Sequence, residues 1–164
     1  MSFVQVLIDI VRAIDAQQKL GMFHGDIKID NVLIHHDKSK DVYSGKMIDL
    51  GQSQRIDGDN FYIGVCFNAF LQRPTHSLSQ FDDKRRDSPH LAPELLLDRR
   101  PKITYETETY AMGLLFKDIG QVFEIDKLFE LGEKCQATEP NQRPSTEVIL
   151  AELYAMVQMK TDEC

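Results

Sequence analysis

HGDIKIDN, at residues 24–31, and IDLG, at residues 48–51, are the two stretches that decide the fold of this 164-residue sequence. Each places carboxylate or amide side chains, namely Asp26, Asn31 and Asp49, beside a short apolar run that is typical of a buried strand. The Asp49 carboxylate, at the end of the second run and followed by Gly51, suits a hard cation that bridges phosphates. Each stretch alone also has a plainer interpretation. The first could cap a turn between a helix and a strand, and the second could be a turn that closes a hairpin.

The sequence around these stretches predicts a mainly α-helical fold with two or three short strands. Apolar spacing and caps indicate four helices and two short buried strands, namely helices over residues 3–20, 105–122, 127–135 and 145–157 and strands over residues 31–34 and 46–48. Apolar residues run most of the way round the helix at 105–122, which predicts burial on several sides. Residues 51–91 show weak periodicity and are expected to be mostly irregular. This order is not the alternating βαβ pattern of a nucleotide-binding sheet.

Composition excludes some classes of function. There are 19 Lys and Arg against 26 Asp and Glu, and the net charge of −7 argues against a nucleic-acid partner. No apolar run approaches the roughly 18 residues of a membrane span, so no membrane partner is expected. Three scattered cysteines without a CxxC pair fit neither a disulfide framework nor a zinc site. We therefore expect a reducing compartment, the cytoplasm or the nucleus.

Three further stretches continue the pattern in order: LAPE at 91–94, TETYAMG at 107–113 and CQATEPNQRPS at 135–145. Together the five stretches resemble the motifs of eukaryotic-type protein kinases, namely H-R-D-x-K-x-x-N, D-F-G, A-P-E, S-D-V-W-S-x-G and C-x-x-x-D-P-x-x-R-P-S. The resemblance covers the C-terminal lobe of that α+β fold. It implies a partial kinase domain over residues 1–160, an activation segment at about 49–94 and a tail at 161–164. The first two stretches are most similar to the spindle-checkpoint kinases called budding uninhibited by benzimidazoles.

The resemblance implies a role for each polar residue of the first two stretches. Phosphoryl transfer needs a positioned nucleophile and charge neutralisation around the γ-phosphate of ATP. Asp26 would orient the hydroxyl of a protein serine or threonine and accept its proton. Lys28 would neutralise the transferring group and contact the nucleotide. Asn31 and Asp49 would bind Mg²⁺ and, through it, the ATP.

The resemblance also implies supporting roles for six residues, namely His24, Leu50, Gly51, Glu94, Glu108 and Arg143. Arg143 is expected to pair with Glu94 beneath the activation segment, with both side chains largely buried. Glu108 stands in place of an aspartate that braces the catalytic loop, and we expect its extra methylene to loosen that brace. Leu50 stands in place of a phenylalanine and is expected to remain an apolar plug.

The sequence departs from the kinase pattern at two positions near the site. Gly25 occupies the place of an arginine that receives an activation-loop phosphate, so switching by such an ion pair is not expected. His90 occupies the place of a common tyrosine, which leaves the peptide preference open.

Residues 1–164 contain no glycine-rich loop, strand lysine or αC glutamate, the parts that hold the nucleotide in kinases. We therefore expect the chain alone to be inactive or nearly so and to bind Mg·ATP poorly. Three explanations stay open: a truncated sequence, a protein partner that supplies or replaces the N-terminal lobe, and a non-catalytic pseudokinase module. Aminoglycoside and choline kinases share H-x-D-x-x-x-x-N, but the A-P-E and R-P-S elements speak against that class.

Overall fold

The structure, a computed structural model, describes residues 3–55, 88–97 and 102–161. Most of the segment at 51–91 that was predicted to be irregular, namely residues 56–87, lies outside the described residues, as do residues 162–164 of the predicted tail. The described residues form the helices α1 (Phe3–Lys19), α4 (Pro93–Leu97), α5 (Tyr105–Val122), α6 (Asp126–Cys135) and α7 (Thr146–Thr161), the strands β1 (Met22–Phe23), β2 (Val32–Asp37), β3 (Val42–Met47) and β4 (Gln54–Arg55), and the 3₁₀ turns η1 (Ile29–Asn31), η2 (Leu50–Gln52) and η3 (Pro140–Gln142).

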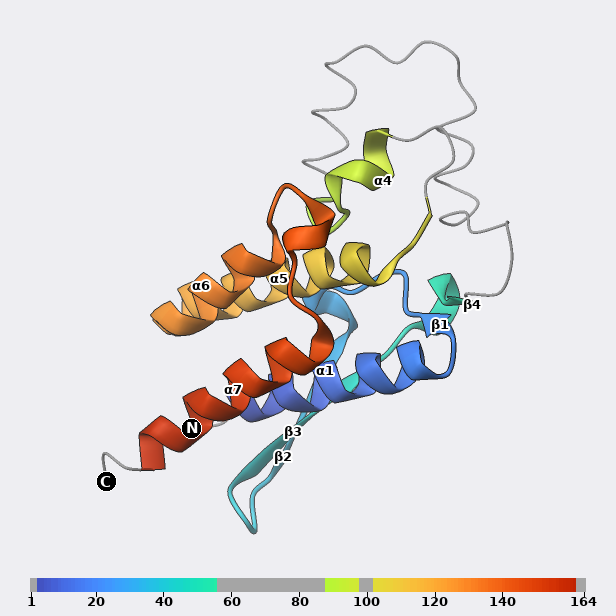
Figure 1. The fold of residues 1–164 in the computed structure, drawn as a ribbon. Coiled ribbons are helices and arrows are strands. Elements are labelled where there is room, and N and C mark those ends of the chain that lie inside the picture. The colour runs from blue at the N-terminus through green and yellow to red at the C-terminus, as the bar shows by residue number, and fades with distance from the viewer. Residues whose placement is uncertain (1–2, 56–87, 98–101, 162–164) are drawn as a thin grey trace.

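The described chain is mainly helical with a few short antiparallel strands, as the sequence predicts. In Figure 1 the helices form two neighbouring pairs, α1 beside α7 and α5 beside α6. Apolar side chains from all four helices meet in one core between the pairs. None of the described helices has the length and apolar character that crossing a membrane would require.

Helix α5 lies at the centre of this core. Its first turn is closed by a capping box, in which Thr104 accepts a hydrogen bond from the backbone of Thr107 and the Thr107 side chain accepts one from Thr104. Most of its residues are buried, and Phe116 and Met112 are fully enclosed. The prediction of a helix buried on several sides is therefore confirmed. A helix surrounded in this way can carry polar side chains outward from the core to the chain segments that pack against it.

The β2–β3 hairpin packs against α1 mainly through β3. Asp9 of α1 accepts a hydrogen bond from the backbone of Gly45 at 3.0 Å. The predicted burial of these strands was wrong, because Leu33 is 55% exposed and Ile34 is 45% exposed. Among the described elements, α1 packs on one side of this two-stranded ribbon, so the other side remains open. The strands are also longer than predicted, with the register running from Val32↔Met47 to Asp37↔Val42.

A second pairing joins β1 to β4 and was not predicted. Met22 pairs with Arg55 and Phe23 with Gln54 in antiparallel register. Two-residue strands are too short for alternation to be visible in a sequence. This pairing holds β1, which comes just before the loop that leads to β2, against β4, which follows η2.

Replacing Phe116 by alanine should lower the free energy of unfolding by about 3–5 kcal/mol, because it leaves a cavity in the centre of the core. The control is Val122→Ala at the end of the same helix, where the side chain is 72% exposed and little should change. Urea denaturation followed by circular dichroism measures both. A loss below about 1 kcal/mol for Phe116→Ala would show that α5 is not packed as described.

Candidate functional site

The loop between β1 and β2 brings Asp26, Lys28 and Asn31 into direct contact. The Lys28 ammonium lies 2.7 Å from Oδ2 of Asp26. The Asn31 amide nitrogen donates to the same oxygen at 3.0 Å and to the Asp26 backbone carbonyl at 2.8 Å. Turn η1 makes this possible by folding the chain back between Lys28 and Asn31. The three residues that the sequence placed in one site therefore form one cluster.

Asp26 is a partly buried carboxylate with donors on both oxygens. His90, from the segment before α4, places Nε2 at 3.2 Å from Oδ1. Burial acts to raise the pKa of Asp26, but the hydrogen bonds from Lys28 and Asn31 outweigh it and hold the pKa below its usual range. Burial also lowers the pKa of His90, with Asp26 opposing the change. The carboxylate is therefore kept ionised and oriented.

His24 ties the start of the loop to the end of β3. The side chain is fully buried, and burial lowers its pKa, which favours the neutral imidazole. Its Nδ1 accepts a hydrogen bond from the backbone of Asp26 at 3.4 Å, so the proton resides on Nε2, which donates to the carbonyl of Ile48 at 3.2 Å. The buried imidazole thus fixes the distance between the Asp26 loop and the residue before Asp49.

Asp49 comes two positions after the end of β3 and lies next to the loop. The backbone of Ile48 donates to the carbonyl of Asn31 at 2.9 Å, which places Asp49 one residue from that contact. Asp49 has left-handed backbone angles, φ 63° and ψ 77°, and its carboxylate accepts a hydrogen bond from Gly51 at 3.0 Å. A non-glycine residue in this region costs of order 1–3 kcal/mol and is found where surrounding contacts impose it.

Leu50 does not act as the predicted apolar plug. Its side chain is 55% exposed, and turn η2, where Leu50 and Gly51 lie, carries no buried residue. The left-handed angles of Asp49 turn the chain abruptly before Leu50, so this side chain projects away from the described core.

The oxygen atoms near the loop suit a hard cation that also binds phosphate. Both contacts of Asn31 to Asp26 use the amide nitrogen, and its amide oxygen takes part in neither. This oxygen and the Asp49 carboxylate are the two candidate ligands. Within the described residues no group of three or more His, Cys, Asp or Glu could hold a metal by itself. Mg²⁺ commonly takes one or two protein carboxylates and completes its coordination shell with water and substrate phosphates. Two protein ligands are consistent with this coordination.

Glu108 of α5 supports the loop from below. It is almost fully buried, and its Oε1 accepts hydrogen bonds from the backbone of His24 at 2.5 Å and of Gly25 at 3.0 Å. Its Oε2 accepts a hydrogen bond from the Gln18 amide at 3.0 Å. Burial raises the pKa of Glu108, and these donors act in the opposite direction. The expected loosening by the longer side chain is not seen, because the carboxylate reaches both backbone groups and gains a third donor from α1.

Gly25 adopts a conformation that other residues tolerate poorly. Its φ is +81°, and a Cβ built there would lie 2.4 Å from the backbone oxygen of Gln52. The arginine common at this position in kinases would therefore require η2 to move. The loop crosses η2 so closely that only glycine fits.

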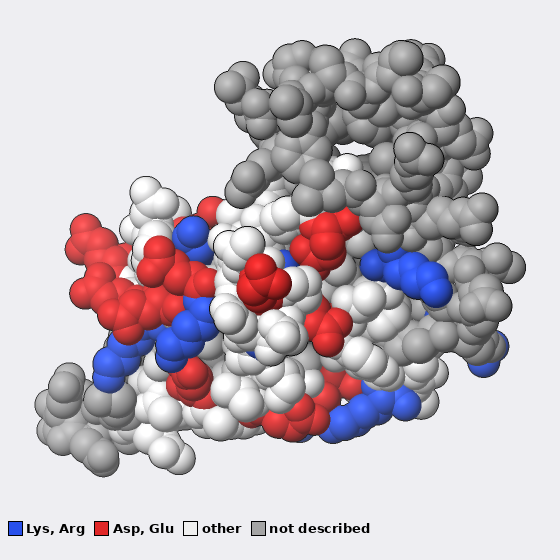
Figure 2. All heavy atoms as spheres, turned by 45° about the horizontal axis from the view of Figure 1, so that its top comes forward, with Lys and Arg blue, Asp and Glu red and all other residues white. Residues whose placement is uncertain are grey.

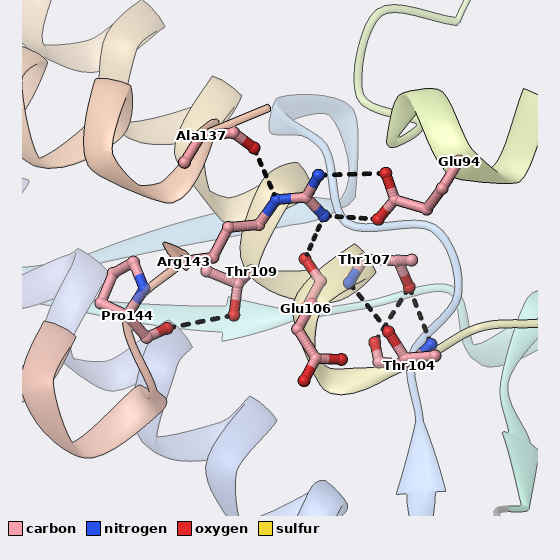
Figure 3. A network of polar contacts seen from close by, with 8 residues as sticks. All are labelled: Glu94, Thr104, Glu106, Thr107, Thr109, Ala137, Arg143 and Pro144. Atoms are coloured by element: carbon pink, nitrogen blue, oxygen red, sulfur yellow. Dashed lines mark hydrogen bonds and ion pairs between the residues drawn. The ribbon is translucent and has the colours of Figure 1, made fainter. Parts of the chain in front are cut away.

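Arg143 joins four separate parts of the chain, as Figure 3 shows. Its guanidinium makes a two-pronged contact with Glu94 at 2.5 and 3.0 Å. It also donates to the carbonyls of Ala137 and Glu106, each at 3.0 Å. The Arg143 side chain is fully buried, whereas that of Glu94 is 33% exposed, so the expected burial of both partners holds for the arginine alone. Helix α4 is thereby attached to α5 and η3.

Three features of the site were not predicted. Sequence reasoning missed the Gln18 contact with Glu108, the His90 contact with Asp26 and the steric need for Gly25. Gln18 is separated from its partner by 90 positions and His90 by 64, counted from residue numbers, and neither lies in a recognisable motif. One signal for these contacts was available in the sequence: Gln18 is a polar residue on an apolar helix face.

Searches with the sequence found no matching protein-family model and no matching curated protein.

Gly25→Ala should destabilise the fold more than Gly21→Ala, and the comparison separates clash from backbone strain. Both glycines have positive φ, but a Cβ on Gly21 meets nothing within 4 Å. Gly21→Ala should therefore cost about 1–2 kcal/mol from the left-handed conformation alone. Gly25→Ala should cost a further 1–3 kcal/mol or so, because the methyl group overlaps the η2 backbone. Equal losses in urea denaturation would contradict the close crossing.

Arg143→Ala should lower the free energy of unfolding by roughly 3 kcal/mol, near the lower end for a broken buried pair because Glu94 retains access to water. The matched control is Arg12→Ala, an exposed arginine on α1, which should be nearly silent. Chemical denaturation of both variants decides the outcome. A loss under about 1 kcal/mol would place Arg143 among ordinary surface ion pairs.

Proposed function

We propose that this chain forms the phosphate-side half of a protein kinase catalytic site and takes part in transfer of the ATP γ-phosphate to protein serine or threonine. The observation that carries the proposal is the cluster of Asp26, Lys28 and Asn31, joined to the residue before Asp49 by a backbone hydrogen bond. These contacts support the proposal because a carboxylate, a cation and two oxygen ligands are the groups that such a transfer requires. The family assignment rests on the sequence resemblance and on this geometry.

Each residue of the cluster has a part in such a transfer. Asp26 is ionised and held by Lys28 and Asn31, so it can accept the proton of an acceptor hydroxyl. Lys28 carries the positive charge that offsets the charge on the transferring group. Asn31 and Asp49 would hold Mg²⁺, which when bound neutralises the phosphates. His24 and Glu108 keep the loop at its distance from Asp49.

The surface charge supports a protein acceptor over a nucleic acid. Figure 2 shows Asp and Glu side chains spread over the visible face and gathered towards the end where α6 lies. Helix α6 itself carries Asp126, Glu130 and Glu133 together with Lys127 and Lys134. The net charge of −7 over the whole chain disfavours a polyanionic partner. A protein acceptor therefore remains part of the proposal. The cytoplasm or nucleus, which was expected from the cysteine pattern, remains part of it as well.

A non-catalytic interaction module is the second candidate. Exposed apolar side chains near the site favour it, namely Leu33 and Leu50. Side chains of this kind commonly mark contact surfaces for another protein segment. The two candidates predict different effects of substitution. In a catalytic site Asp49 affects nucleotide binding and Asp26 affects the acceptor, whereas an interaction module predicts no such separation.

Asp49→Asn should reduce Mg²⁺-dependent ATP binding about tenfold, whereas Asp26→Asn should leave it within about twofold, since Asp26 acts on the acceptor. Isothermal titration of ATP with and without Mg²⁺ measures this in the chain, where we expect weak binding. The residual phosphate transfer expected of the chain alone, measured with radiolabelled ATP and a serine and threonine peptide library, should disappear in both variants.

Asp41→Asn is the matched control, because Asp41 is also a left-handed aspartate, with φ 51°, but lies at the tip of the β2–β3 hairpin. It should change neither binding nor transfer. If ATP binding does not depend on Mg²⁺, or if Asp26→Asn and Asp49→Asn weaken it equally, the assigned roles are wrong and the interaction module is favoured.

A further inference from the structure

Both oxygens of the Asp26 carboxylate already have donors, and little of the group is open to solvent. Lys28 and Asn31 contact Oδ2, and His90 contacts Oδ1 at 3.2 Å. The side chains of Asp26 and His90 are only 16% and 15% exposed. An acceptor hydroxyl must come within about 2.6–3.2 Å of a base to give up its proton. In this conformation the His90 imidazole covers Oδ1, the oxygen of Asp26 that neither Lys28 nor Asn31 contacts.

The His90 contact is not needed to orient the carboxylate. Two donors from the same loop, Lys28 and Asn31, already fix Asp26 through Oδ2. His90 comes from a different part of the chain, the segment 88–97, and it adds a contact to the opposite oxygen. The main effect of the imidazole is therefore to cover Oδ1.

The backbone around His90 is anchored, whereas its side chain reaches across to the loop. A turn closed by the Leu91 amide and the Ser88 carbonyl, at 3.1 Å, surrounds His90. Ala92 is fully buried just after it, and Glu94 is held by Arg143. Rotation about the His90 side-chain bonds can therefore uncover Asp26 without displacing α4.

We propose that His90 gates the acceptor position: its imidazole occupies Oδ1 of Asp26, and an acceptor serine or threonine must displace it before its own hydroxyl can bind there. The gate rests on the proposed phosphotransfer function for its biological meaning, but the closure itself is a property of the chain. His90 thereby limits which acceptors reach the base, because an acceptor must offset the lost imidazole contact.

Carbodiimide labelling of Asp26 with glycine ethyl ester tests the closure without any need for activity. Peptide mass spectrometry gives the modification rate of Asp26, with any cross-link to Lys28 counted as modified. His90→Ala should raise that rate about fivefold, the factor that corresponds to one hydrogen bond. His90→Gln retains an amide donor and should stay close to the wild type. His36→Ala is the matched control, because His36 also contacts an aspartate, Asp41, at 2.9 Å, and it should leave Asp26 unchanged.

Circular dichroism verifies that each variant is folded, and His90→Ser replaces His90→Ala if the latter unfolds. An unchanged Asp26 rate in a folded small-residue variant overturns the gate, whatever the transfer assay shows. In that assay the gate predicts an acceptor KM lowered about fivefold in His90→Ala with kcat little altered. A raised KM overturns it. Faster labelling together with ATP binding that depends on neither Mg²⁺ nor Asp49 supports the closure and contradicts the proposed function.

Discussion

The buried carboxylate of Glu108 is the contact on which the site depends. It lies on the central helix α5 and accepts hydrogen bonds from the loop backbone at His24 and Gly25 and from Gln18 of α1. Taking a carboxylate out of water is costly unless its oxygens are paired. The donors meet that requirement only while the loop and α1 keep their positions against α5. The conformation of the loop is therefore coupled to the packing of the hydrophobic core.

Contacts to the backbone, and not contacts between the side chains of Asp26 and Asp49, connect the loop held by Glu108 to Asp49. Gly25 is held so close to η2 that a methyl group has no room, and the Ser53 hydroxyl donates to the His24 carbonyl at 3.2 Å. His24 in turn binds the carbonyl of Ile48. The left-handed backbone of Asp49 is stabilised at the end of this series. Asp26 and Asp49, both among the described residues, thus keep a fixed relation although no hydrogen bond joins their side chains.

A second support, Arg143, holds the segment that carries His90. The fully buried guanidinium binds Glu94 and two carbonyls, so α4 is attached to the helical core close to the loop. Its charge is stabilised by several partners, and a Tyr110 ring lies 5.0 Å from the guanidinium carbon. Because Glu94 is four positions after His90, this attachment brings an imidazole within reach of Asp26. The surroundings of Oδ1 of Asp26 are therefore shaped by a residue far from the loop in sequence.

Local patterns in the sequence were sufficient for four of the five described helices but not for α4, and the kinase resemblance supplied the grouping of Asp26, Lys28 and Asn31 and the Glu94–Arg143 pair. Helical spacing and turn residues act over a few positions, so they can be recognised without tertiary contacts. The exposure of Leu33 and Leu50, the β1–β4 pairing, the Gln18 contact and the placement of His90 were decided only by the tertiary structure. Each depends on which surfaces meet across many positions of the chain, and burial and hydrogen-bond partners are properties of that meeting rather than of the residues themselves.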